Sequence, residues 1–197
     1  MSIGREKYMS KAEVKQLRTI TEAQSIIALK KGQVKGVKAW VLIDTALQTG
    51  LRVSELAAIK IEDIDFKRCA LKVIRLKRKK RVIETLAIDK DLTQHLKEYI
   101  DWTGHTKGKL FTGQRGDITA QGLQQIWKAA IKQAGLPKEL SIHSARHTLA
   151  VHLLKKTGNL RQVQKQLGHS SPVITANQYA DIPFEDMASG ITKLYED

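Results

Sequence analysis

One stretch of the chain, between about residues 64 and 88, follows a different pattern from the sequence on either side, and it limits the possible folds most. Within it, residues 70–76 and 81–88 are rich in Val, Ile and Leu and are typical of two paired β-strands. Before and after it, apolar residues recur at helical spacing. The order of helices, a small antiparallel sheet and further helices predicts a mainly α fold with a minor sheet (α+β).

The helical segments have recognisable starts and ends. Residues 10–13 (SKAE) match a capping box, in which Ser10 caps a helix and Glu13 reaches back to it. We expect Gly32 and Gly36 to interrupt the helical pattern that follows, and Gly50 to end the second helix. The helices expected after the first cover residues 37–48, 54–59, 91–103, 120–134, 144–157, 160–167, 172–179 and 184–194.

The charge balance favours a polyanionic partner. Thirty-four Lys and Arg against 20 Asp and Glu give a formal net charge of +14, which favours encounter with nucleic acid in a salt-dependent way. The aromatic content of 5% argues against a single-strand binding surface built on stacked rings. The single cysteine, Cys69, excludes an internal disulfide and a cysteine-based metal site.

We expect one domain over residues 1–197, with a core at about 10–181 and a tail helix at about 182–197, because no linker interrupts the sequence. No apolar run approaches the roughly 18 residues that would span a bilayer. The first residues lack the apolar segment of a signal peptide. A cytoplasmic protein that does not bind membranes is therefore expected.

Arg52 is the first candidate for chemistry. It lies in the phrase TGLRVSEL (residues 49–56), where a turn opens a helix, so its guanidinium can bind a phosphate with help from the helix amides. Glu55, three residues later, could hold it in place. Taken alone, an ordinary surface Arg–Glu pair is the more common reading.

The turn of the predicted hairpin is the second candidate. Its four residues, Lys77, Arg78, Lys79 and Lys80, are all cationic and include no Gly, Asn or Asp. Four cations in one turn repel each other, which makes structural sense mainly where an anion binds. The alternative is a solvated basic turn.

The third and fourth candidates lie near the end of the chain. His143 and Arg146 stand three apart at a helix start, which places a proton-transfer group and a fixed cation on one face. A zinc site at His143 and His147 is disfavoured, because no Glu follows His143 as the metallohydrolase motif requires. Further on, LGHSSP (residues 167–172) is followed by Tyr179, a residue type that alone is most often part of a core.

In this order, the arginine, the lysine hairpin, the His-x-x-Arg motif, the Leu-Gly-His motif and the tyrosine resemble the tyrosine recombinase (phage integrase) family. The resemblance extends from about Ser10 to Leu194 and rests on TGLRVSEL, HSARHT and LGHSSP with its tyrosine. It implies a site-specific DNA recombinase or integrase that cleaves and rejoins strands without a metal or another cofactor.

The resemblance also implies a role for each candidate residue. Two arginines would clamp the scissile phosphate, Tyr179 would form a 3′-phosphotyrosine bond, and Lys77 would protonate the leaving 5′ oxygen. His143 would serve the nucleophile as acid or base, and His169 would hydrogen-bond a non-bridging oxygen. Lys79 stays an alternative to Lys77, since the turn lacks the glycines often found around the family's lysine. The full expected set is Arg52, Lys77, His143, Arg146, His169 and Tyr179 as catalytic residues, Glu55 and His147 as supporting residues, and Arg75, Arg78, Lys79, Lys80 and Arg81 as DNA contacts.

The partner implied by the resemblance is double-stranded DNA with specific recombination sites. We expect four protomers on the DNA and a monomer in free solution, with the last helix (Phe184, Met187, Ile191 and Leu194 on one face) docked on a neighbour or on its own domain. The separate N-terminal DNA-binding domain that is usual in the family has no counterpart in these 197 residues. A type IB topoisomerase and a DNA-binding regulator with an inactive site are the alternatives.

Overall fold

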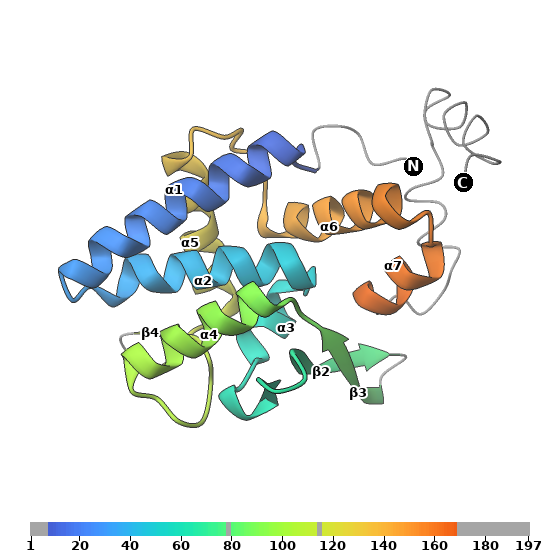
Figure 1. Ribbon diagram of the computed structural model, residues 1–197, viewed down its shortest axis with the longest axis horizontal. Coiled ribbons are helices and arrows are strands. Elements are labelled where there is room, and N and C mark those ends of the chain that lie inside the picture. The colour runs from blue at the N-terminus through green and yellow to red at the C-terminus, as the bar shows by residue number, and fades with distance from the viewer. Residues whose placement is uncertain (1–7, 78–79, 114–115, 169–197) are drawn as a thin grey trace.

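The computed structural model describes residues 8–77, 80–113 and 116–168, and Figure 1 shows how their elements are arranged. The helices are α1 (Lys11–Lys30), α2 (Val34–Thr49), α3 (Val53–Ala58), α4 (Lys90–Thr103), α5 (Ala120–Gln133), α6 (Ile142–Thr157) and α7 (Leu160–Leu167), with a 3-10 turn, η2 (Ile61–Asp63). The strands are β1 (Ile64–Asp65), β2 (Ala70–Lys77), β3 (Lys80–Ala87), β4 (Thr112–Gly113) and β5 (Gly116–Asp117).

The predicted fold class is confirmed, because the described chain is mainly helical with small antiparallel sheets. The predicted hairpin is β2 and β3, in which Lys77 pairs with Lys80 across the turn. The sequence pattern did not reveal β1, which adds two residues to the edge of β2, or the short β4–β5 hairpin. Strands of two residues are too short to show an alternating pattern.

Helix α2 is the centre of the domain. It packs against α1, α4, α5 and α6, and in Figure 1 it runs between them (in light blue). Consecutive residues of this helix are buried: Val41, Leu42 and Ile43 are each at most 1% exposed, and so are Asp44 and Thr45. A helix with this many buried residues belongs inside a larger core, and this one carries its C-terminal end to the candidate site.

Gly36 does not interrupt the helical pattern as expected; it lies inside α2. A Cβ at this position would lie only 2.6 Å from Cβ of Ala28 in α1. The glycine therefore allows α1 and α2 to approach closely, and the helix keeps it at the usual cost in helix propensity. The break between the helices falls at residues 31–33, where Gly32 has the positive φ of 64°.

Gly50 ends α2 as predicted, in the left-handed conformation with φ 61°. A Cβ there would lie 2.8 Å from Leu167 Cδ2 and 2.9 Å from Leu149 Cδ2. The end of α2 is thus in close contact with α6 and α7, whose own apolar residues form a second small cluster with Ala150 and Val163. The close packing brings segments about 100 residues apart in the sequence to one place.

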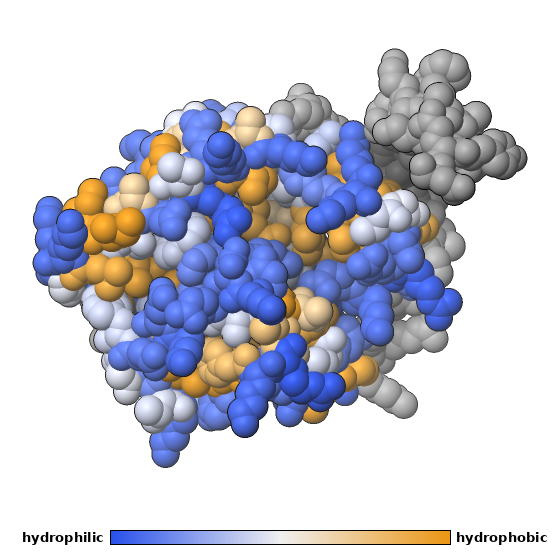
Figure 2. All heavy atoms as spheres, in the orientation of Figure 1, coloured by the Kyte–Doolittle hydropathy of each residue, from blue (hydrophilic) through white to orange (hydrophobic). Residues whose placement is uncertain are grey.

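The surface is mostly hydrophilic on the face shown in Figure 2, and one of its groups of apolar atoms lies at the end where α1 meets α2. Ile26, Ile27, Leu29 and Val34 are the exposed large apolar residues of that end. Within the described part of the chain, none of the helices combines the length and the apolar character needed to cross a bilayer. The helices expected at residues 172–179 and 184–194 lie outside the described residues.

Candidate nucleic-acid cleavage site

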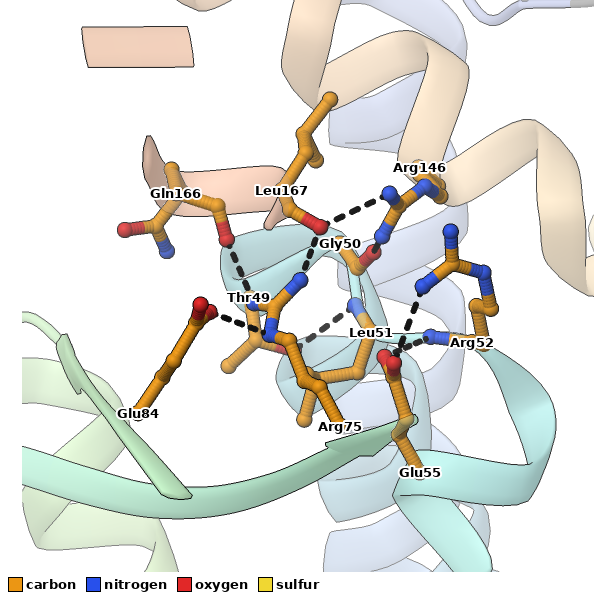
Figure 3. Close-up of polar contacts among 10 residues, drawn as sticks. All are labelled: Thr49, Gly50, Leu51, Arg52, Glu55, Arg75, Glu84, Arg146, Gln166 and Leu167. Atoms are coloured by element: carbon orange, nitrogen blue, oxygen red, sulfur yellow. Dashed lines mark hydrogen bonds and ion pairs between the residues drawn. The ribbon is translucent and has the colours of Figure 1, made fainter. Parts of the chain in front are cut away.

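The predicted site residues that the structure describes gather around the turn that follows α2. The turn, residues 49–52, is flanked by the start of α3, by β2, by α6 and by the last residues of α7 (Figure 3). The N-terminal half and the C-terminal third of the chain therefore contribute to one place. Each contribution is fixed by a different kind of contact.

Arg52 is held by Glu55 at both its backbone and its side chain. The Arg52 backbone N–H donates to Glu55 Oε2 at 2.8 Å, and its Nη1 donates to Oε1 at 3.0 Å. Glu55 is almost buried, with its side chain 8% exposed, whereas the Arg52 side chain is 45% exposed. The carboxylate is thus a fixed support that presents the guanidinium at the surface, which is the pairing that the sequence spacing predicted.

Arg146 is placed differently, because its side chain is buried, at 7% exposure. Its Nη1 donates to the carbonyl of Gly50 at 2.9 Å, and its Nη2 donates to the carbonyl of Leu167 at 2.8 Å. One guanidinium therefore joins the end of α2 to the end of α7. The contacts fix the guanidinium plane close to the turn that carries Arg52 (Figure 3).

Two of the three histidines of α6, His143 and His147, lie in its first two turns. His143, at the second residue of the helix, is exposed, and His147 is partly buried. His143 and Arg146 both lie at the start of α6, as expected, but His143 is exposed whereas Arg146 is buried. Among the described residues, no group of three or more His, Cys, Asp or Glu side chains is arranged to hold a metal ion.

Arg75 does not lie on the outer surface of the hairpin, as a DNA contact would. It is 1% exposed, on the same inward face of β2 as Leu71 and Val73. Its Nε lies 2.9 Å from Glu84 Oε2, its Nη2 donates to the Gln166 carbonyl at 2.8 Å, and its Nη1 donates to the Leu167 carbonyl. The expectation that Arg75 contacts DNA directly is therefore corrected: strand alternation turns this side chain into the domain.

The electrostatics around Arg75 connect it with the rest of the site. Burial lowers the pKa of its guanidinium, the nearby carboxylates of Glu55 and Glu84 raise that pKa, and the charge of Arg52 lowers it. Desolvation disfavours the charged form of the guanidinium, and the neighbouring positive charge of Arg52 acts in the same direction. The two carboxylates offset part of this accumulation of positive charge.

The other predicted site residues are less completely described. Arg81 is exposed on β3, next to Lys80, whose backbone pairs with that of Lys77. Arg78, Lys79, His169 and Tyr179 lie outside the described residues. The structure thus brings together Arg52, Glu55, Arg146 and the strand of Lys77.

Sequence reasoning missed three contributors to the site, namely the carbonyls of Gly50 and Leu167 and the ion pair between Arg75 and Glu84. The inward position of Arg75 could have been found, because its alternation with Leu71 and Val73 places all three on one face of β2. The carbonyls carry no side-chain signal, since any residue type provides the same acceptor.

Comparison with known proteins places these features in a family. The phage integrase family model matches residues 7–185. A tyrosine recombinase of Pseudothermotoga lettingae is 30% identical over 164 residues, which are 83% of this chain and 56% of the relative. Tyrosine recombinase XerC of Corynebacterium glutamicum is 39% identical over 132 residues, which are 66% of this chain and 42% of the relative. The chain spans about half the length of the curated relatives it matches.

Solved structures share the fold. The crystal structure of XerA recombinase superposes with a TM-score of 0.76 at 23% identity, covering 96% of this chain and 65% of that one. The integrase from mycobacterium phage Brujita gives a TM-score of 0.61 at 24% identity, covering 98% of this chain and 59% of that one. With the family match over residues 7–185 and the arginines arranged around the α2–α3 turn, these findings show that the chain belongs to the phage integrase family, the family of the tyrosine recombinases.

Proposed function

We propose that this chain is the catalytic part of a site-specific DNA recombinase that cleaves and rejoins strands through a covalent 3′-phosphotyrosine. Family membership supports the reaction class, and related proteins have been captured on DNA. XerH recombinase has been solved with a palindromic difH substrate in a post-cleavage complex, and the Tn1549 transposon integrase with transposon right-end DNA. The proposal carries this chemistry over to the residues of this chain.

The observation that carries the proposal is the placement of two guanidiniums at one turn. Arg146 donates to the carbonyl of Gly50, and Arg52 follows two residues later with Glu55 behind it. A phosphodiester between them would receive charge-assisted hydrogen bonds on its non-bridging oxygens. These bonds strengthen as negative charge builds up on the pentavalent transition state, so the pair stabilises that state more than the bound substrate.

The other residues are assigned from their motifs. The Tyr179 hydroxyl forms a bond to phosphorus as the bond from phosphorus to the 5′ oxygen breaks. His143 accepts the tyrosyl proton, with His147 as a supporting residue, and Lys77 donates a proton to the departing oxygen. His169 hydrogen-bonds a non-bridging oxygen. Because the phosphotyrosine keeps the energy of the broken bond, the 5′ hydroxyl of a partner strand can attack it without nucleotide hydrolysis.

The DNA contacts and the assembly belong to the same proposal. Arg78, Lys79, Lys80 and Arg81 are assigned as DNA contacts, because these cations follow Lys77 in the sequence and the net charge of +14 favours duplex DNA. We assign residues 10–181 to the catalytic core and 182–197 to a tail helix. Four protomers act together on DNA, the protein is a monomer in free solution, and it works in the cytoplasm without membrane contact.

The first test is strand cleavage in EDTA. Because Arg52, Arg146 and Lys77 supply the positive charge that a metal would otherwise supply, covalent protein–DNA adduct should form at an unchanged rate, within about twofold, with or without a chelator. The substrate is a set of nicked duplexes tiled from the DNA that flanks the gene, and the adduct is read on a denaturing gel. A strict requirement for Mg²⁺ would contradict the proposed chemistry.

Lys77 and Lys79 can be separated by changing the leaving group. Lys77→Ala should slow cleavage of normal DNA by roughly 10²-fold, because the 5′ oxygen then leaves without its proton. A substrate with sulfur in place of that oxygen needs no proton donor, since a thiol has a pKa of only about 8.5. The sulfur substrate should therefore restore the Lys77→Ala rate to near wild type. If the sulfur substrate instead restores the rate of Lys79→Ala and leaves Lys77→Ala slow, Lys79 is the residue that protonates the leaving oxygen.

Glu55 tests whether the support of Arg52 matters for the chemistry. In Glu55→Gln the negative charge opposite the guanidinium is lost while the side chain keeps its size and one acceptor oxygen. We expect cleavage to slow by about 10-fold to 10²-fold at saturating protein, because a small displacement of a clamp residue is costly. The DNA Kd should change less than about threefold, since one exposed arginine is a minor part of the electrostatic binding. A weaker Kd with an unchanged rate would make Arg52 a binding residue only.

A further inference from the structure

The carbonyl of Leu167 accepts hydrogen bonds from two different arginines. Arg146 Nη2 donates to it at 2.8 Å from α6, and Arg75 Nη1 donates to it from β2. Arg75 Nη2 also donates to the carbonyl of Gln166 at 2.8 Å. These are the last two residues of α7, whose carbonyls have no partner within their own helix. The end of α7 is therefore satisfied by cations from other elements, and its negative dipole end faces them.

Arg75 is suited to this contact by its shape and its burial. It is 1% exposed and has Glu84 as its counter-charge, with Nε 2.9 Å from Oε2. A planar guanidinium can reach two adjacent carbonyls and a carboxylate at once, which a lysine cannot do. Without it, the Gln166 carbonyl would lose this donor, the Leu167 carbonyl would keep only Arg146, and Glu84 would lose this ion pair.

Gly168 fits around the same side chain. Its φ is 65°, and a Cβ there would lie 2.5 Å from Cζ and 2.6 Å from Cδ of Arg75. Because Arg75 is fixed by its contacts to Glu84 and α7, it has little freedom to move aside. The chain can thus turn out of α7 at residue 168 only with a glycine while Arg75 occupies this position.

The positions of these residues in the chain connect the contacts with the proposed reaction. Arg75 lies two residues before Lys77 on β2, and the Leu167 carbonyl lies two residues before His169. The same carbonyl binds Arg146, which binds the Gly50 carbonyl next to the turn of Arg52. Three segments that carry proposed catalytic residues therefore meet at the Leu167 carbonyl oxygen, and Arg146 links a fourth, the turn of Arg52, through the Gly50 carbonyl (Figure 3).

We propose that Arg75 is a positioning residue, which fixes the C-terminal end of α7 relative to the lysine-bearing strand and to Arg146. Arg75 does not contact the DNA phosphate in this proposal. Its effect on cleavage rests on the proposed recombinase function, whereas its effect on α7 does not. The two parts can therefore be tested separately.

The experiment compares Arg75→Met and Arg75→Lys with a matched control, Lys72→Met. Lys72 lies on the same strand but is exposed, on the opposite face, so the control makes the same chemical change without the contacts to α7. Hydrogen exchange followed by mass spectrometry is measured on the free proteins for peptides that cover residues 160–168. Adduct formation at saturating protein and the DNA Kd are measured on the nicked duplexes.

In Arg75→Met we expect exchange in residues 160–168 to rise at least about tenfold, while α1 and α5 exchange as in wild type. Adduct formation should slow by about 10²-fold, as for a displacement of about 1 Å in a reacting group, with the DNA Kd within about threefold of wild type. Arg75→Lys keeps the charge and should recover part of the rate. Lys72→Met should match wild type in exchange and in rate.

The outcomes separate the two proposals. If wild type forms no adduct, the recombinase function fails, and faster exchange confined to α7 still supports the positioning contact. Unchanged exchange in α7 with Arg75→Met would overturn the inference. A DNA Kd that weakens in step with the cleavage rate would also overturn it, because Arg75 would then be a phosphate ligand. Faster exchange throughout the domain in both Arg75→Met and Arg75→Lys would overturn it too, because Arg75 would then be a general stability residue.

Discussion

Replacing Arg146 with alanine is expected to slow covalent adduct formation by about 10³-fold or more, while the DNA Kd changes only a few-fold. Arginines that stabilise the charge of a phosphoryl-transfer transition state contribute about 10³-fold to 10⁵-fold to the rate. Arg146 is one charge among 34 Lys and Arg, so its share of the electrostatic attraction to DNA is small. Arg146→Ala should therefore slow adduct formation far more than it weakens DNA binding.

Arg146 also has a structural role that must be separated from its chemistry. Its guanidinium joins the Gly50 and Leu167 carbonyls, and its loss leaves both without this donor in a buried place. We expect the free energy of unfolding of Arg146→Ala to fall by about 2–4 kcal/mol, from two hydrogen bonds to a charged group. Urea unfolding measures this loss and shows whether the variant is folded under the conditions of the cleavage assay.

Arg146→Lys is the matched control for the shape of the group. It keeps the charge but cannot bind two carbonyls and a phosphate with one planar fork. We expect its unfolding free energy to lie between those of wild type and the alanine variant, and its cleavage rate to stay at least about 10²-fold below wild type. Equal losses in rate and in DNA affinity for the folded variants would contradict a role in the transition state.

The sequence predicted those parts of the fold that depend on local pattern. The β2–β3 hairpin, the capping of α1 by Ser10 and the end of α2 at Gly50 follow from alternation, from a side-chain cap and from a left-handed glycine. The Arg52–Glu55 pair follows in the same way, because residues three apart at a helix start are neighbours. In each case the signal and the structure lie within a few residues of each other.

Features that depend on tertiary packing were not predicted. Gly36 was expected to break a helix, but the approach of Ala28 from α1 selects a glycine inside α2. Arg75 was assigned to DNA with the other cations of the hairpin, but its acceptors are carbonyls some 90 residues later in the chain. Backbone acceptors leave no mark in the sequence, so the way in which the end of α7 organises the site emerges only from the folded chain.

The second prediction with a large expected effect concerns the nucleophile. Tyr179→Phe removes one oxygen and leaves the ring, so folding and DNA binding should be unchanged within about twofold. Without the hydroxyl no bond to phosphorus can form, and adduct should fall by more than about 10⁴-fold, below detection. Tyr195→Phe is the matched control, since Tyr195 is the other tyrosine near the end of the chain and carries no role in the proposal.

The most direct measurement compares wild type, Tyr179→Phe and Tyr195→Phe for covalent adduct on the tiled nicked duplexes, on a denaturing gel with EDTA present. We expect adduct with wild type and with Tyr195→Phe, at rates within about threefold of each other, and none with Tyr179→Phe. Adduct formed by Tyr179→Phe at the wild-type rate would place the nucleophile elsewhere in the chain and contradict the account.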